Sequence, residues 1–107
     1  MVNERFSNWD VADFIRDTAD AKAYLTVALE ESVDDPTAVP RALGAIARSG
    51  NMTDLARQVG MSREGLYNAL SANGNPTWAT IIKITDALGL HISIAPNTQR
   101  VKELQPV

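Results

Sequence analysis

The 107-residue sequence predicts an all-α fold: a compact domain of five helices with an N-terminal extension and a short C-terminal strand. Apolar residues recur at spacings of three and four, which is the period of helices that bury one face. Glycine and proline interrupt this pattern at short intervals, which favours short helices joined by tight turns. With 45% hydrophobic and 21% charged residues, the composition is typical of a globular chain with a single core.

The first third of the chain is expected to be helical. Residues 11–17 are compatible with a short helix, and residues 20–32 with a longer one that Asp20 caps. The second helix should end before the acidic turn at 33–36. Its apolar stripe would consist of Ala21, Tyr24, Leu25, Ala28 and Leu29.

A third helix is expected near 37–49. Pro40 must lie in its first turn, where the missing N–H is not needed. Gly50 follows the helix and suits a left-handed C-terminal position. The face that carries Leu43, Ile46 and Ala47 should point to the core.

Three further helices are expected near 53–59, 62–72 and 76–88, the last with Pro76 at its first position. Residues 90–95 then alternate between apolar and polar side chains, which is the period of a strand. The whole chain is expected to form one domain. Its parts are an acidic helical extension (1–35), a core (36–89), a strand (90–95) and a tail (96–107).

The charge is unevenly distributed along the chain. The net charge is −3, yet residues 1–40 hold nine acidic against three basic side chains. Residues 41–86 hold five basic against three acidic side chains, so this part is mildly basic. The overall acidity therefore does not exclude nucleic-acid binding by the middle of the chain, and non-specific DNA affinity should be weak.

The composition argues against an enzyme. The chain has no cysteine, which excludes disulfides, thiolate zinc sites and cysteine nucleophiles, and His91 is its one histidine. We therefore expect no catalytic residues, metal or cofactor. No apolar run approaches the roughly 20 residues that span a bilayer, which predicts a cytoplasmic protein without membrane contact.

The most informative motif is the run MTDLARQVGMSREGLYNALS at 52–71. Two helices that cross over a tight turn need a small residue where they meet, and Ala56 supplies it. Gly60 suits the positive φ of such a turn, Met61 fills the corner and Ser62 is a favourable N-cap. The shared core would come from Leu55, Val59, Leu66 and Leu70. The spacing predicts a helix-turn-helix.

The second helix of this motif has a polar face opposite its core leucines. Arg63 has the geometry for a bidentate contact to guanine, and Asn68 for one to adenine. Tyr67 and Ser71 can reach phosphate or a thymine methyl, and Glu64 could accept from cytosine or repel the backbone. An ordinary surface helix also has a polar face, so that alternative stays open.

The chain resembles the antidote proteins of chromosomal toxin-antitoxin modules, a branch of the phage-repressor (Cro/XRE-like) helix-turn-helix superfamily. The resemblance runs from about Trp9 to Ile94. Its marks are Leu-Gly-x-Ile-Ala-Arg at 43–48, SREGLY with Ala-Leu-Ser at 62–71, Gly-Asn-Pro at 74–76 and Ala-Leu-Gly-Leu at 87–90.

This resemblance implies a lambda-repressor-like fold and an antitoxin that binds a RelE-like ribonuclease toxin and represses its own operon through operator DNA. The superfamily pattern places DNA contacts on the second helix of the motif, here Ser62, Arg63, Glu64, Tyr67, Asn68 and Ser71. Relatives often have lysine at the position of Asn68, so no operator sequence can be carried over.

Several further residues have two interpretations each. Asn75 and Thr77 are candidate phosphate contacts or simple helix caps, and Arg48 and Arg57 are candidate phosphate contacts or solvated surface. The acidic N-terminal third suits a basic toxin or merely favours solubility. A homodimer is expected because helix-turn-helix proteins read near-palindromic sites, with residues 90–95 as a candidate interface.

Two other functions remain open on the sequence. The chain could be a stand-alone repressor of the same fold without a toxin. Alternatively, it could be a protein-interaction module that kept the helix-turn-helix shape and lost DNA binding. A short basic ribonuclease-like gene next to this one would favour the antitoxin, and a DNA-binding assay would test the interaction module.

Overall fold

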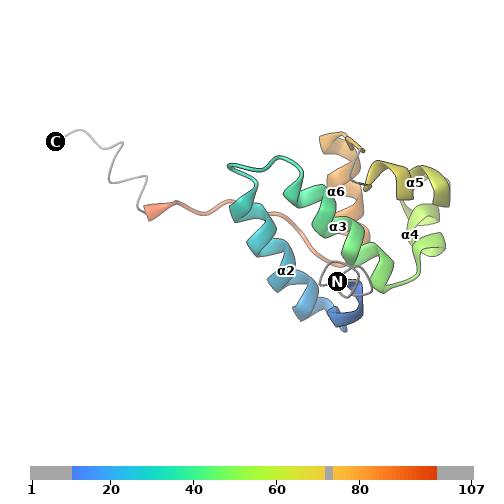
Figure 1. Ribbon diagram of the computed structural model, residues 1–107, viewed down its shortest axis with the longest axis horizontal. Helices are drawn as coiled ribbons and strands as arrows, with labels where there is room; N and C mark the ends of the chain where they lie inside the picture. Colours follow the sequence, from blue (N-terminus) through green and yellow to red (C-terminus); the bar gives the residue numbers. More distant parts are fainter. Residues whose placement is uncertain (1–10, 72–73, 99–107) are drawn as a thin grey trace, which may run out of the picture.

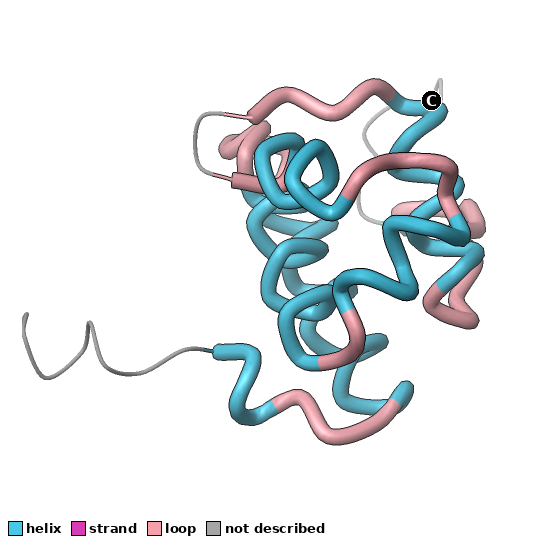
Figure 2. Tube along the Cα trace, turned by 90° about the vertical axis from the view of Figure 1, so that its right-hand side faces the viewer, coloured by secondary structure: helices cyan, strands magenta, loops and turns pink. Residues whose placement is uncertain are grey.

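The computed structural model describes residues 11–71 and 74–98, and within these ranges the chain is all-helical, without a strand (Figures 1 and 2). The expectations for residues 1–10, Ala72 and the tail from Gln99 lie outside the described residues. The elements are the 3₁₀ helix η1 (Val11–Phe14), α2 (Thr18–Glu31), α3 (Ala38–Ser49), α4 (Met52–Gln58), α5 (Arg63–Ala69) and α6 (Trp78–Ala87).

Helix α3 lies at the centre of the fold. It packs against α2 and η1 on one side and contacts α4 and α6 on the other, while α4 and α5 pack against each other (Figure 1). Leu43 in α3, Leu66 in α5 and Ile84 in α6 are each 0% exposed. These three side chains join separate helices in one hydrophobic cluster, which holds the α4–α5 pair on the rest of the domain.

The N-terminal end of α2 differs from the sequence prediction. Asp17, not Asp20, is the N-cap, and its Oδ1 accepts from the backbone N–H of Asp20 at 2.9 Å. The Asp20 carboxylate instead accepts from Nε of Arg16 at 3.0 Å, and this contact lowers the pKa of Asp20. Two aspartates three residues apart both fit a helix start, and the pairing with Arg16 selects the earlier one.

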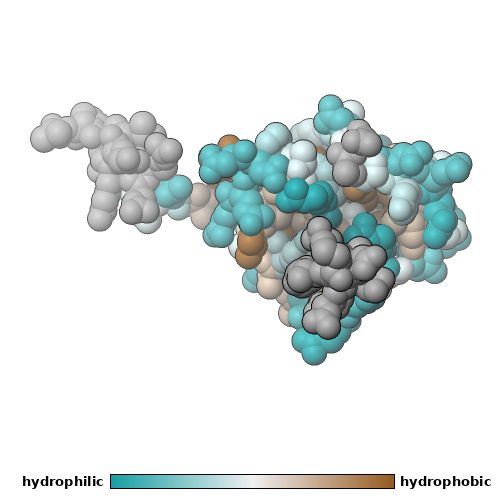
Figure 3. All heavy atoms as spheres, in the orientation of Figure 1, coloured by the Kyte–Doolittle hydropathy of each residue, from teal (hydrophilic) through white to brown (hydrophobic). Residues whose placement is uncertain are grey.

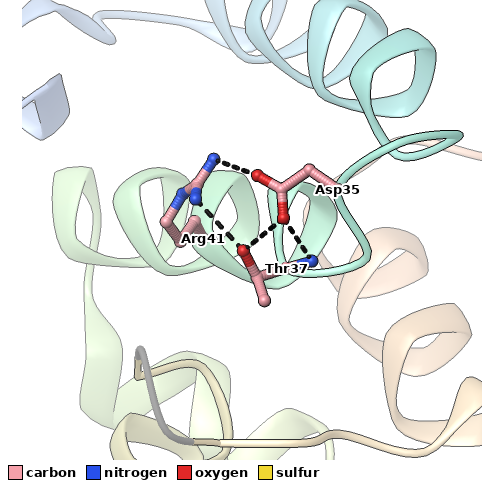
Figure 4. A network of polar contacts seen from close by, with 3 residues as sticks. All are labelled: Asp35, Thr37 and Arg41. Carbon is pink, nitrogen blue, oxygen red and sulfur yellow. Dashed lines mark hydrogen bonds and ion pairs between the residues drawn. The ribbon is translucent and has the colours of Figure 1, made fainter.

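A polar network ties the loop between α2 and α3 to the first turn of α3 (Figure 4). Asp35 Oδ1 accepts from the hydroxyl of Thr37 at 2.7 Å and from its backbone N–H at 3.0 Å. Arg41 donates to Asp35 at 3.2 Å and to the Thr37 hydroxyl at 3.1 Å. The hydrogen bonds from Thr37, with the nearby Arg41 charge, hold the pKa of Asp35 below its usual range.

This network predicts a loss of stability in acid. An aspartate whose pKa is lower in the folded than in the unfolded state stabilises the fold at pH values above its unfolded pKa of about 3.9. This stabilisation disappears as the pH falls through the pKa of the folded state. Wild type should therefore exceed Asp35→Asn in urea midpoint at pH 7, and the difference should shrink between about pH 5 and pH 3. Thr37→Val should give a smaller change in the same direction. A difference that stays constant across this range contradicts the prediction.

Glycines set two of the helix ends. Gly60, between α4 and α5, has φ of +76°, as predicted for the turn of the motif, and Gly89 after α6 has φ of +81°. The prediction of a left-handed Gly50 is wrong, because its φ is −119°. Gly50 leads directly into Asn51, the extended N-cap of α4, so the chain turns there without a left-handed residue.

Gly60→Ala should lower the free energy of unfolding by about 1 to 2 kcal/mol, because a Cβ disfavours positive φ. Gly50→Ala is a matched control. A Cβ at either glycine meets no atom within 4 Å, so the two variants differ in backbone conformation alone. Urea denaturation should find Gly50→Ala as stable as wild type or slightly more so. Equal losses in both variants would rule out strain at the turn as the cause.

Two predicted helix ends and the predicted strand need correction. Helix α5 ends at Ala69, and α6 begins at Trp78 with Thr77 as N-cap, so Pro76 precedes the helix. The strand predicted at 90–95 does not form within the described part of the chain. A strand needs a hydrogen-bonded neighbour, and the described residues supply none. Leu90 instead packs on the core, and its N–H donates to the Thr85 carbonyl at 2.9 Å.

Candidate nucleic-acid interface

The candidate site is built on α5 and the turn before it. Ser62 is the N-cap of α5, as predicted, and its Oγ accepts from the backbone N–H of Gly65 at 2.9 Å. The N–H of Met61 donates to the Ala56 carbonyl at 2.8 Å, which closes the turn after α4. Leu66 is fully buried and fixes the rotation of α5. The opposite face of α5 is therefore held outward.

That outward face carries four of the predicted contact residues. Arg63, Glu64 and Asn68 are exposed, and Tyr67 is 52% exposed. Ser71 does not belong to this helical face because α5 ends before it. Its side chain is half-buried and donates to the Asn68 carbonyl at 2.8 Å. The outward face of α5 thus consists of Arg63, Glu64, Tyr67 and Asn68.

A cleft of about 680 Å³ lies between the end of α3, the start of α4 and α5. Arg48, Arg63 and Tyr67 are predicted site residues that the fold brings together in its wall, although α3 and α5 are separate in sequence. The other lining residues are Gly50, Asn51, Met52 and Thr53. Two guanidinium groups and a phenol around one open cleft suit an anion such as a backbone phosphate.

Three predicted site residues lie elsewhere. Arg57 in α4 pairs with Asp54, one turn earlier, and does not line the cleft. Thr77 caps α6, and its Oγ1 accepts from the backbone N–H of Thr80 at 3.1 Å, as the cap interpretation predicted. Asn75 is exposed in the loop before α6. Of the four candidate phosphate contacts Arg48, Arg57, Asn75 and Thr77, only Arg48 therefore lines the cleft.

Sequence reasoning missed Asn51 and Thr53 as cleft residues. Asn51 caps α4, and its Oδ1 accepts from the N–H of Asp54 at 2.9 Å. No contact role was predicted for Asn51. The available signal was the Asn-x-Thr run at the start of the first motif helix, because the N-terminus of a helix favours anions.

The surface over α4 and α5 is largely hydrophilic, as an interface with DNA requires (Figure 3). Across residues 11–71 and 74–98, no cluster of acidic and histidine side chains is suited to a metal ion. Nor does this part of the chain contain a helix with the length and apolar character needed to cross a membrane.

Two comparisons with known proteins found proteins similar to this chain. Residues 5–96 match the family described as "Probable addiction module antidote protein". An uncharacterized protein of Haemophilus influenzae is 42% identical over 93 residues, which cover 87% of this chain and 94% of that protein. No solved structure is a significant match to this chain.

Proposed function

Because the chain belongs to the addiction module antidote family, we propose that it neutralises a RelE-like ribonuclease toxin and represses its own operon by binding operator DNA. The family implies a toxin partner and indicates a regulatory rather than a catalytic protein. The ribonuclease nature of the toxin, operator binding, the Cro/XRE-like helix-turn-helix and a cytoplasmic location are the parts we propose. Operator binding is the part that the site supports most directly.

The observation that carries DNA binding is the position of Arg48, Arg63 and Tyr67 around one cleft beside the exposed face of α5. In the proposed complex, α5 enters the major groove. Arg63 reads guanine from the first turn of the helix, and Asn68 reads adenine. Arg48 and Tyr67 hold the flanking phosphate and so fix the register.

The remaining predicted contacts have supporting roles. Ser62 orders the start of α5 as its cap, and Glu64 accepts from cytosine or excludes other bases. Ser71 acts through the end of α5, because its hydroxyl is bound to the Asn68 carbonyl. Asn75, Thr77 and Arg57 are proposed as outer phosphate contacts only.

The proposed toxin contact lies on the acidic N-terminal third. At the end of α2, Glu30, Glu31 and Asp34 are exposed close to two exposed apolar side chains, Val27 and Val33, at 51% and 82%. A ribonuclease must attract a polyanion and is therefore expected to be basic. Acidic residues around small apolar groups suit such a partner in charge and contact.

We also propose that the protein acts as a homodimer. Two copies related by a two-fold axis would present two α5 helices to a near-palindromic operator, whose half-sites lie about 34 Å apart, or one helical turn. A monomer would read only one half-site and would bind with lower specificity.

The decisive experiment titrates the purified protein against its own upstream DNA at two salt concentrations, with and without the product of the adjacent gene. The protein should bind its upstream DNA more tightly than scrambled DNA at both salt concentrations. Its affinity for the upstream DNA should change when the product of the adjacent gene is added.

The outcomes separate the alternatives. Specific DNA binding without any effect of the adjacent product would support a stand-alone repressor. Binding to that product without specific DNA binding would support an interaction module. Failure to bind either would contradict the proposed function as a whole.

A further inference from the structure

Helix α6 carries a row of exposed side chains that the domain itself does not use. Trp78 is 63% exposed, Ile82 is 39% exposed, and Asp86 is exposed as well. These residues are four apart, so they stack along one side of the helix and form an i±4 ridge. On the opposite side of α6, Ile84 is 0% exposed and anchors the helix in the core. We call Trp78, Ile82 and Asp86 the α6 ridge.

The helix does not need a tryptophan at this place. Thr77 already caps α6, and the first position of a helix accepts small or acidic residues readily. A tryptophan has 150 to 250 Å² of surface that can be buried, and it is enriched in interfaces, where it has both an apolar ring and an N–H donor. With Ile82 one turn away, Trp78 forms an apolar contact surface on the exposed side of α6.

The ridge is complementary to itself. Trp78 lies one turn before Ile82, and Asp86 lies one turn after it. If two α6 helices cross antiparallel with the two-fold axis at Ile82, each Trp78 lies next to the partner's Asp86. The indole N–H is a donor and the carboxylate is an acceptor, so each ridge carries both halves of the contact.

We propose that the α6 ridge is the two-fold interface between two copies of this chain, with Ile82 on the axis. In the commonest class of helix pair in globular proteins, the i±4 ridges of the two helices interdigitate. The inference rests on the proposed homodimer but not on DNA binding. Since α6 contacts α3 and α4, an axis on α6 also fixes the relative position of the two α4–α5 pairs.

Cysteine cross-linking tests the axis directly, because the chain contains no cysteine of its own. Ile82→Cys places a single thiol where each residue meets its own copy, and a disulfide needs Cα atoms within about 7 Å. Mild oxidation at low protein concentration should convert most of this variant to a covalent dimer. Val27→Cys, at an exposed position on α2, is the control and should stay monomeric on a non-reducing gel.

The antiparallel register is tested by a second pair of variants. Two Trp78 positions lie eight residues apart along the crossing helices, or about 12 Å at 1.5 Å per residue. Trp78→Cys alone should therefore cross-link poorly, whereas the double variant Trp78→Cys/Asp86→Cys should cross-link well. Equal cross-linking of Ile82→Cys and Val27→Cys, or of both Trp78 variants, overturns the assignment.

Sedimentation gives an independent readout. Wild type should have about twice the 11.6 kDa mass of one chain, and Ile82→Lys should have the single mass because two ammonium groups meet on the axis. Val27→Lys should remain dimeric, and circular dichroism should show unchanged helicity. If Ile82→Lys is still a dimer, the α6 ridge is not the interface, but the homodimer proposal remains. A monomeric wild type overturns both, without bearing on toxin binding.

Discussion

Leu66→Ala should lower the free energy of unfolding by about 3 kcal/mol, the largest stability loss we expect from a single substitution here. Leu66 is 0% exposed and joins α5 to the central cluster. Removal of its branched end loses the transfer free energy of the deleted carbons and leaves a cavity. Urea denaturation at one fixed protein concentration, followed by circular dichroism, measures the loss.

Leu29→Ala is the matched control for this experiment. It makes the same chemical change at a position in α2 that is 38% exposed, where less contact is lost and no closed cavity forms. We expect a change below about 1 kcal/mol. Similar losses in the two variants would show that Leu66 does not hold α5 on the core in the way that its burial indicates.

Much of the fold could be predicted because its signals are local. Apolar spacing located all five α-helices, and Ser62 and Gly60 were correctly predicted as the cap and the turn that orient α5. A side chain that bonds a backbone N–H three residues later, or a backbone angle that only glycine tolerates easily, can be recognised within a few residues. Such features do not depend on the rest of the chain.

The wrong or missing predictions concern residues that compete for one role and contacts between segments far apart in the sequence. Asp20 was predicted as the cap of α2, but Asp17 caps the helix and Asp20 pairs with Arg16. Gly44 was not singled out, although a Cβ there would lie 2.9 Å from the carbonyl oxygen of Leu70. Contact between α3 and the end of α5 joins segments far apart in the sequence. A local pattern cannot reveal that only glycine leaves room for it.

In the candidate site, too, local features could be predicted and contacts between distant segments could not. The outward face of α5 followed from helical periodicity, and Arg63, Tyr67 and Asn68 are exposed as predicted. The cleft did not follow, because it forms where three helices meet and needs Arg48 beside α5. Ser71 was placed on the helical face only because α5 was expected to continue through it.

Arg63→Ala should weaken binding to the specific operator by about 5- to 150-fold, which corresponds to about 1 to 3 kcal/mol. The guanidinium stands in the first turn of α5 and in the wall of the cleft, so its loss removes a directional contact as well as a charge. Arg63→Lys keeps the charge but not the planar fork, and it should recover only a small part of the affinity. Fluorescence anisotropy with labelled operator measures all three proteins.

The control for charge is Lys22→Ala in α2, which removes one positive charge from a helix that does not line the cleft. Both alanine variants have the same net charge, so Lys22→Ala shows how much affinity is lost through overall charge alone. A loss that is much larger for Arg63→Ala, and that persists at high salt, therefore measures direct readout. If the two variants bind the operator alike, or Arg63→Lys binds like wild type, Arg63 contributes only charge, and the major-groove role of α5 has to be assigned to other residues.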